Sequence, residues 1–316
     1  MPATAAPVVL VEGPVSDEQL EEIRRAAPAA RCERVARQEI GDRIEEADIV
    51  AGHVGPAELA RARHLRWVHT WSAGVDHSLF PELVASEVVM TCSKSNGAVP
   101  LAEHAMLLML MLNRDAVRWI RAQDERRWAP FTHGELAGQT CGIIGLGYSG
   151  ADLAIKAKAF HMRVLGMRRS QEPVPGVDEL YTRERLHDFL RECDVVVITA
   201  PRTPETLGML GDAELRVMKE SAFLVTFSRG GIVDDEALLR ALREGWIAGA
   251  GLDVHGQEPL PEGSPFWTAP HTIVTPHNGA TTKATRQRAI DIFADNLRRF
   301  CDGEELRNVV DKAAGY

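Results

Sequence analysis

Three glycines behind a short apolar segment constrain the fold of this chain more than any other feature. Residues 141–144 read as an apolar strand, and Gly145, Gly147 and Gly150 follow them in the spacing G-x-G-x-x-G. Glycines at this spacing let the chain turn sharply, approach a pyrophosphate closely and pack a helix on the strand. The phosphates then lie at the positive N-terminus of that helix. The spacing alone also fits an ordinary turn, so its context decides between a dinucleotide site and a plain connection.

The residues after the next predicted strand favour a phosphorylated dinucleotide. Sites that prefer NAD usually carry an acidic residue about 20 positions after the glycines. In this chain the strand at 163–167 is followed by Arg168, Arg169 and Ser170 instead. Two guanidinium groups can bind a 2′-phosphate through charge-assisted hydrogen bonds, and the serine hydroxyl adds a donor. We therefore expect NADP(H) as the preferred cofactor, with NAD also open; a basic turn without a ligand is the alternative.

Predicted strands and helices alternate along the whole chain, which is typical of α/β proteins with parallel sheets. The series before residue 100 has strands at 8–11, 31–35, 49–51, 67–70 and 88–90 and a helix at 17–27. Helices at 100–113 and 116–128 come next. The later series has strands at 141–144, 163–167, 195–198, 222–226, 249–254 and 272–275 and helices at 150–159, 182–192, 212–217 and 235–243. It predicts a doubly wound dinucleotide-binding domain, and a last amphipathic helix at 283–302 should pack back on a core.

Composition excludes several other classes of protein. The 316 residues, 45% of them hydrophobic and 26% charged, suit about two domains with substantial cores. The net charge of −9 comes from interspersed charges without a basic stripe, so we expect no nucleic-acid partner. The longest apolar run, 105–112, is far shorter than the roughly 20 residues that span a bilayer, and the first residues lack the features of a signal peptide. We therefore expect a mature start and no membrane contact. The five scattered cysteines indicate neither disulfides nor a metal site, so we expect a cytoplasmic location.

Three segments that follow strands of the later series carry residues suited to the reduction of a keto acid. Ligands of open α/β sheets bind at these strand ends. Arg229 is the only charged residue between an apolar strand and a Gly-Gly turn, so it suits a clamp for a carboxylate; a structural ion pair is the alternative. His277 suits the proton donor because the pKa of histidine lies near neutrality. Glu258 is the expected partner that stabilises its imidazolium form.

Together these segments resemble the D-isomer-specific 2-hydroxyacid dehydrogenase family over nearly the whole chain. The resemblance rests on motifs in the family's order: Ser72-Ala73-Gly74-Val75-Asp76, Leu101-Ala102-Glu103-His104, the glycine turn, Pro201-Arg202-Thr203-Pro204-Glu205-Thr206, Ser228-Arg229-Gly230-Gly231, Leu252-Asp253-Val254, Glu258-Pro259-Leu260-Pro261 and Thr275-Pro276-His277. It implies two Rossmann-like doubly wound domains. A discontinuous, flavodoxin-like substrate domain would comprise 1–99 and 283–316, and the dinucleotide-binding domain 100–282, with the active site in the cleft between them.

The resemblance also implies roles for individual residues. Arg229 would bind the carboxylate and keto oxygen of the substrate, His277 would be the acid/base, and Glu258 would pair with His277. Substrate would also meet the backbone amides of Ala73, Gly74 and Val75, and Asp253 would hold the nicotinamide carboxamide. The cofactor would further contact Leu146, Tyr148, Ser149, Pro201, Thr206, Phe227 and Ser228. Members usually form homodimers through the nucleotide domain and the segment before it, here 113–133.

The sequence departs from the family's pattern at several positions near these motifs. Ser95 stands where glycine is frequent, and His255 replaces the usual aromatic residue after Asp-Val. The arginine-rich end of the second strand resembles the reductases that use NADPH to reduce glyoxylate or hydroxypyruvate, so we expect a small 2-oxo acid as substrate. Two alternatives stay open: an NAD-preferring dehydrogenase of larger 2-oxo acids, and a protein that senses NAD(P)H without turnover.

Overall fold

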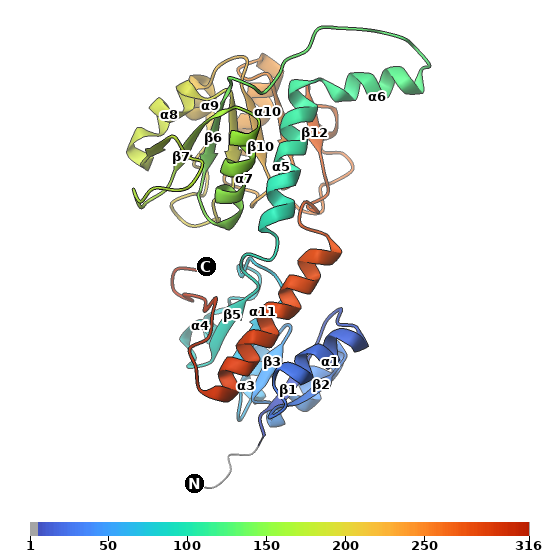
Figure 1. Cartoon of the computed structure of the whole chain (residues 1–316), viewed down its shortest axis with the longest axis vertical. Coiled ribbons are helices and arrows are strands. Elements are labelled where there is room, and N and C mark those ends of the chain that lie inside the picture. Colours follow the sequence, from blue (N-terminus) through green and yellow to red (C-terminus); the bar gives the residue numbers. More distant parts are fainter. Residues whose placement is uncertain (1–5, 316) are drawn as a thin grey trace. The chain divides into compact units, whose positions relative to one another are not determined.

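The chain folds into two compact units, which a computed structural model describes for residues 6–315 (Figure 1). Residues 1–5, on which the expected mature start rests in part, lie outside the described residues. The first unit runs to Gly97 and resumes at Thr282, and the second unit spans Ala98–Thr281. Each unit contains one parallel sheet covered by helices. Among residues 6–315, no helix is both long enough and apolar enough to cross a membrane.

The first unit has a five-stranded parallel sheet in the order β2-β1-β3-β4-β5. Its strands are β1 (Val8–Val11), β2 (Arg31–Arg34), β3 (Ile49–Ala51), β4 (Trp67–Thr70) and β5 (Val89–Cys92). Its helices are α1 (Asp17–Ala26), α2 (Ile40–Arg43), α3 (Pro56–Arg61), α4 (Pro81–Ala85) and α11 (Lys283–Asp302). The strand order is that of flavodoxin-like sheets, so the predicted fold class of this unit is confirmed.

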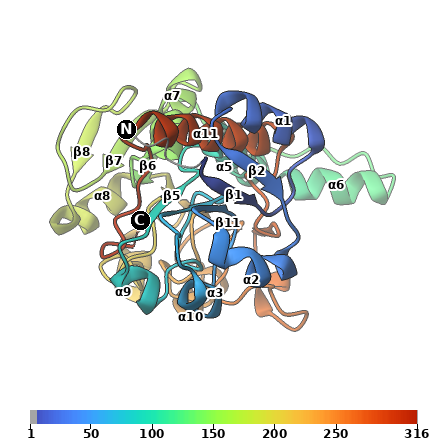
Figure 2. The ribbon, with the colours of Figure 1, turned by 90° about the horizontal axis from the view of Figure 1, so that it is seen from below.

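Helix α11 belongs to the core of the first unit although it lies almost 200 residues after β5 in the sequence. Figure 2 shows α11 beside α1, and Gln287 at its start accepts a hydrogen bond from Gln19 of α1 at 3.1 Å. Ile290, Phe293 and Leu297 recur on one face of α11 and are buried against β1, β3 and β4. The predicted return of the last helix to a core is therefore confirmed.

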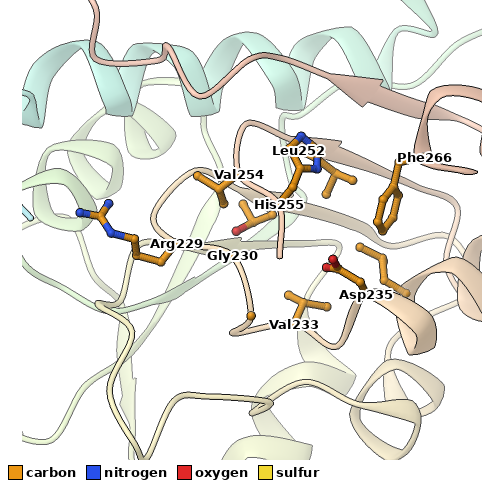
Figure 3. Close-up of a pocket in the computed structure, with 11 residues that line it drawn as sticks. Arg229, Gly230, Val233, Asp235, Leu252, Val254, His255 and Phe266 are labelled. Atoms are coloured by element: carbon orange, nitrogen blue, oxygen red, sulfur yellow. The ribbon is translucent and has the colours of Figure 1, made fainter. Parts of the chain in front are cut away.

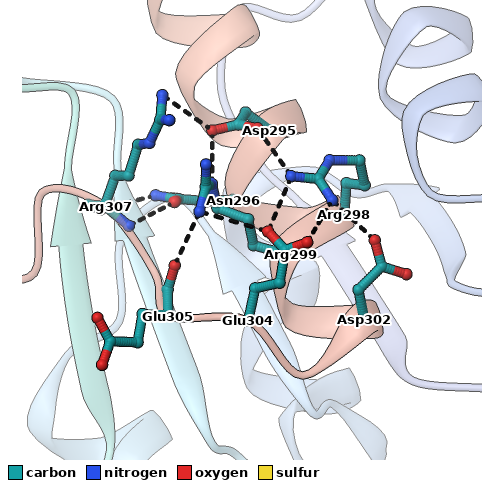
Figure 4. A network of polar contacts seen from close by, with 8 residues as sticks. All are labelled: Asp295, Asn296, Arg298, Arg299, Asp302, Glu304, Glu305 and Arg307. Carbon is teal, nitrogen blue, oxygen red and sulfur yellow. Dashed lines mark hydrogen bonds and ion pairs between the residues drawn. The ribbon is translucent and has the colours of Figure 1, made fainter.

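Polar contacts fasten the chain after α11 to the same helix (Figure 4). The side-chain amide of Asn296 donates to the carbonyl of Arg307 at 2.9 Å, and its oxygen accepts from the Arg307 amide at 2.8 Å. Asp295 binds Arg299 at 2.8 Å, and Glu304 lies 3.4 Å from the same guanidinium. Asn296 is fully buried, so its two hydrogen bonds hold the segment after α11 in place against the helix.

The second unit has a seven-stranded parallel sheet in the order β12-β11-β10-β9-β6-β7-β8. Its strands are β6 (Thr140–Ile144), β7 (Arg163–Met167), β8 (Glu179–Tyr181), β9 (Val195–Ile198), β10 (Phe223–Thr226), β11 (Gly249–Leu252) and β12 (Thr272–Val274). Its helices are α5 (Ala98–Asn113), α6 (Ala116–Asp124), α7 (Tyr148–Ala159), α8 (Leu186–Glu192), α9 (Asp212–Val217) and α10 (Asp235–Glu244). With one further strand at its edge, this is the order of the Rossmann dinucleotide-binding fold, which confirms the predicted doubly wound domain.

Both faces of the second sheet are buried, as its apolar strands require. Alternate residues of a strand point to opposite faces. In β9, Val195 and Val197 pack with α5 and α7, whereas Val196 and Ile198 pack with α8, α9 and α10. A continuous apolar run therefore suits a strand that is covered on both sides.

Some predicted boundaries were wrong for local reasons. The helix predicted at 116–128 ends at Asp124, because Arg126 adopts a left-handed backbone conformation with φ of 54°. Helix α7 begins at Tyr148, so Gly150 lies in its first turn rather than at its start. Strand β11 ends at Leu252, which places Asp253 in the loop after it. The short elements α3, α4 and β8 were not predicted, because they are too brief to show a periodic pattern.

Candidate active site

The glycine turn after β6 has the space that a dinucleotide requires. Gly145 has φ of 97°, and a Cβ atom there would lie 2.6 Å from the amide nitrogen of Ala200. A Cβ atom on Gly150 would lie 2.2 Å from the carbonyl oxygen of Gly145, so helix and strand pack too closely for any side chain. Among residues 6–315, no atom lies within 4 Å of a Cβ atom on Gly147. Among these residues, no side chain caps the start of α7 at Gly147. The amides of its first turn and the open space beside them therefore fit the phosphates of a dinucleotide.

The two arginines lie directly beside this turn. Met167, the last residue of β7, pairs with Ile144 in register, and its carbonyl accepts a hydrogen bond from Gly145 at 2.9 Å. Arg168 and Arg169 follow at once, the first half-buried and the second exposed. Ser170 accepts a hydrogen bond from the amide of Glu172 at 3.2 Å, which leaves its own proton for donation. The position that an acidic residue takes in NAD-preferring sites is therefore cationic, which fits a 2′-phosphate.

The other predicted cofactor contacts differ in accessibility. Tyr148 and Pro201 are exposed, Leu146, Ser149 and Ser228 are half-buried, and Phe227 lies in the core with 3% of its surface exposed. The side chain of Phe227 is therefore not available to a ligand. Thr206 closes the loop after β9 by donating to the carbonyl of Pro201 at 2.7 Å.

Glu258 and His277 form a hydrogen-bonded pair. Oε2 of Glu258 lies 2.6 Å from Nδ1 of His277, and Oε1 accepts from the amide of His255 at 2.9 Å. Burial acts to raise the pKa of Glu258, but the hydrogen bonds from His277 and His255 outweigh it and lower this pKa below its ordinary value. Glu258 is therefore a carboxylate, and Nδ1 of His277 carries the proton of the bond. This bond leaves Nε2 as the second ring nitrogen of His277 for other partners.

Arg229 lies on a turn that packs against the loop before Glu258, at His255. It follows β10, and its guanidinium donates to the carbonyl of Ser228 at 2.7 Å. A Cβ atom on Gly230 would lie 1.9 Å from the carbonyl oxygen of His255, the residue whose amide holds Glu258. The glycine thus lets the Arg229 turn touch the loop of the carboxylate directly. The fold brings the three candidate catalytic residues, far apart in sequence, to neighbouring loops of one unit.

A small cavity lies behind the Arg229 turn (Figure 3). Its volume of about 10 Å³ suits about one water molecule. Nε2 of His255 and Oγ1 of Thr226 are buried here without a partner among the described residues, and burial raises the pKa of Asp235. Figure 3 shows the guanidinium of Arg229 pointing away from Asp235. The cavity is too small for a cofactor or a keto acid.

Asp253 is fully buried and binds the loop that carries His277. One carboxylate oxygen accepts from the hydroxyl of Thr275 at 2.6 Å and from the amide of Asn278 at 3.1 Å. The other accepts from the amide of Gly279 at 3.0 Å. These contacts were not predicted from the sequence, where Asp253 was expected only to hold the nicotinamide carboxamide. That role stays a prediction.

The predicted substrate loop of the first unit follows β4. Ala73 is exposed, Gly74 is half-buried and Val75 is buried. The hydroxyl of Ser72 donates to the carbonyl of Gly74 at 2.7 Å, which closes the loop into a turn. The contact of these three amides with a substrate carboxylate stays a prediction.

Comparison with known proteins identifies the family. A model of the NAD binding domain of D-isomer specific 2-hydroxyacid dehydrogenases matches residues 106–279. The glyoxylate reductase of Pyrococcus furiosus is 32% identical over 292 residues, which cover 88% of this chain and 86% of that protein. The glyoxylate reductase of Korarchaeum cryptofilum is 33% identical over 291 residues, with the same coverage of 88% and 86%.

Two solved structures resemble the whole chain. An NADPH-dependent glyoxylate/hydroxypyruvate reductase from Sinorhizobium meliloti, in complex with NADP and sulfate, superimposes with a TM-score of 0.85 at 29% identity and covers 98% of this chain and 100% of its own. A D-isomer specific 2-hydroxyacid dehydrogenase from Xanthobacter autotrophicus, in complex with NADPH and MES, has a TM-score of 0.84 at 30% identity and covers 99% and 100%. The chain therefore belongs to the D-isomer-specific 2-hydroxyacid dehydrogenase family and is an NAD(P)-dependent oxidoreductase.

Proposed function

We propose that this protein uses NADPH to reduce a small 2-oxo acid such as glyoxylate or hydroxypyruvate. The hydrogen-bonded pair of Glu258 and His277 beside the Arg229 turn is the observation that carries the proposal. The relatives from Pyrococcus and Korarchaeum are glyoxylate reductases, and the Sinorhizobium relative is a glyoxylate/hydroxypyruvate reductase that depends on NADPH. The cationic turn at Arg168 and Arg169 supports the same cofactor.

The side chains divide the reaction among themselves. A bound nicotinamide supplies the hydride. Arg229 orients the substrate by binding its carboxylate and polarises the keto oxygen, because a guanidinium forms paired hydrogen bonds to such oxygens. His277 holds a proton on Nε2 and delivers it to the keto oxygen as charge develops there. Glu258 keeps the ring oriented through Nδ1 and stabilises the imidazolium that serves as the acid.

The acid/base role is tested by replacing His277. Loss of a general acid costs roughly 10²–10⁴ in rate, so His277→Gln should lower kcat by that factor with glyoxylate while NADPH still binds. The exposed His161 provides a matched control, because it lies at the end of α7 away from the catalytic loops. Turnover of His277→Gln within threefold of wild type would refute the assignment. Tight NADPH binding without any turnover in the wild type would favour the sensing protein instead.

The cofactor preference is tested by initial rates with NADPH and NADH against glyoxylate, hydroxypyruvate, pyruvate and phenylpyruvate. We expect higher kcat/KM with NADPH, and expect the double replacement of Arg168 and Arg169 by alanine to remove most of this preference. Arg191→Ala, on the exposed face of α8, is the control for the loss of a surface charge. Equal or better rates of the wild type with NADH would contradict the role of the arginine pair. Faster reduction of phenylpyruvate than of glyoxylate would favour larger substrates.

We further propose that the protein forms a homodimer through α6 and the segment up to residue 133. Helix α6 extends away from the sheet of the second unit (Figure 1) and exposes Trp119 and Ile120, with Trp128 just beyond its end. Trp128 is 96% exposed, which is unusual for so large an apolar side chain. Sedimentation equilibrium should give twice the chain mass, and Ile120→Asp should shift the protein toward monomer. A wild-type monomer would contradict the proposal.

A cytoplasmic location accompanies this proposal. All five cysteines are free thiols, and burial raises the pKa of Cys32 to about 11 and of Cys141 to about 12. Such thiols are unreactive and suit a reducing compartment. Cell fractionation with a reporter fused to the C-terminus would test the location.

A further inference from the structure

His277 adopts a backbone conformation that a residue with a side chain ordinarily avoids. Its φ is 50°, in the left-handed region where a Cβ atom crowds the carbonyl oxygen. Such a conformation persists only where surrounding contacts determine it. The neighbouring residues therefore explain how His277 is held, and these contacts lie within the second unit.

The carboxylate of Asp253 binds the chain on both sides of His277. It accepts a hydrogen bond at 2.6 Å from the hydroxyl of Thr275, two residues before the histidine. It also accepts hydrogen bonds from the amides of Asn278 at 3.1 Å and Gly279 at 3.0 Å, just after the histidine. Hydrogen bonds to an ionised oxygen are among the stronger ones in proteins, and these are excluded from water because Asp253 is fully buried. The three bonds close the loop into the turn that presents His277.

His104, in the second turn of α5, completes this network. Its Nε2 lies 3.1 Å from Oγ1 of Thr275 and 3.5 Å from the Asp253 carboxylate, and its side chain is 12% exposed. The hydroxyl of Thr275 has a single proton, which it donates to Asp253. It can therefore only accept from His104, so Nε2 of His104 carries a proton. The order of donation is His104 to Thr275 to Asp253.

Packing reinforces the network. A Cβ atom on Gly279 would lie 2.9 Å from both the Asp253 carboxylate and the His104 ring. The chain after His277 thus passes directly over both side chains. Neither His104 nor Thr275 has a role in the proposed chemistry, and both belong to motifs that sequence reasoning singled out without a function.

We infer that His104, Thr275 and Asp253 are positioning residues that hold His277 in its left-handed turn, with Nε2 aimed for proton transfer. The inference rests on the proposed role of His277 as the acid. None of the three donates the proton. A displacement of about 1 Å at a reacting group can cost around 10²-fold in rate, so a loosened loop should lower kcat much more than it weakens cofactor binding.

Thr275 gives the sharpest test, because valine has nearly its shape but lacks the hydroxyl. In Thr275→Val we expect kcat to fall by about 10–100-fold, with the Kd for NADPH within twofold of wild type. The solvent deuterium isotope effect on kcat should rise, since proton transfer becomes slower. Thr275→Ser keeps the hydroxyl and should restore kcat to within about threefold. Thr272→Val, at the start of β12 and three residues before Thr275, removes a hydroxyl that donates to the carbonyl of Pro270 and serves as the matched control.

The outcomes separate this inference from the proposed function. If His277→Gln loses activity but Thr275→Val keeps kcat within twofold of wild type, the positioning network is refuted and the acid is not. If His277→Gln keeps full activity, the proposed function fails first. If Thr275→Val does not fold, His104→Phe, which keeps an aromatic ring but has no donor, replaces it as the test. That variant removes the outer donor of the network, and we expect a fall in kcat of at least threefold with NADPH binding unchanged; an unchanged kcat would overturn the inference.

Discussion

His69 should make the first unit lose stability in mild acid. It lies in β4, is fully buried, and is surrounded by the rings of Trp67, Trp71 and Phe293. Its ring nitrogens bond to the hydroxyls of Thr91 at 2.8 Å and Ser93 at 3.1 Å. Burial lowers the pKa of His69 from 6.5 to about 3, because the charged ring would lose its hydration.

The magnitude follows from this difference in pKa. Below pH 6.5 the unfolded chain binds a proton that the folded chain refuses until the pH approaches 3, so stability falls as the pH falls through this window. Each pH unit corresponds to about 1.4 kcal/mol. Between pH 7.5 and pH 5 this single histidine should therefore reduce the free energy of unfolding by about 2 kcal/mol.

Hydrogen exchange of the β4 amides in graded urea measures this free energy for the first unit alone. Exchange would be recorded at pH 7.5 and pH 5 and corrected for the intrinsic rates. The variant His69→Gln should lose about 2 kcal/mol less than wild type over this interval. Ser93→Ala is the control: it removes one hydrogen-bond partner but keeps the titrating ring, so it should be less stable at both pH values and keep the wild-type difference. Equal losses in wild type and His69→Gln would refute the reasoning.

Three further predictions concern single positions. Ser95 has φ of 82°, so Ser95→Gly should raise the free energy of unfolding by about 1 kcal/mol in urea titrations; an unchanged midpoint would contradict this strain. Gly147→Ala has open space for its Cβ atom and should fold normally yet weaken NADPH binding at least tenfold, whereas Gly150→Ala meets a carbonyl at 2.2 Å and should lower the melting temperature; the reverse pattern would refute the reading of the turn. In Glu258→Gln the neutral amide no longer stabilises the imidazolium, so kcat should fall and the alkaline limb of the rate profile should move to lower pH; an unmoved limb would show that the charge of Glu258 is unimportant.

Local patterns were sufficient to predict most of the architecture. Strands such as Val195–Ile198 and Arg163–Met167 consist mostly of apolar residues in short runs, and their predicted bounds match the observed ones. The spacing of the glycines indicated a dinucleotide turn partly because Gly150 must lie against the carbonyl of Gly145, only five residues earlier. Elements whose ends depend on a single backbone angle, such as the end of α6 near Arg126, were placed wrongly.

The sequence by itself determined the fold class, the family and the types of residue that the chemistry needs, because these depend on residue identity and spacing along the chain. The tertiary structure alone decided which side chains meet. His104 and Thr275 are 171 positions apart, and only the packing of α5 against the sheet brings them together with Asp253. The burial of His69 and its lowered pKa likewise depend on Phe293 from the last helix. Hydrogen-bond partners and solvation are set by distances in space, which no local pattern of this sequence encodes.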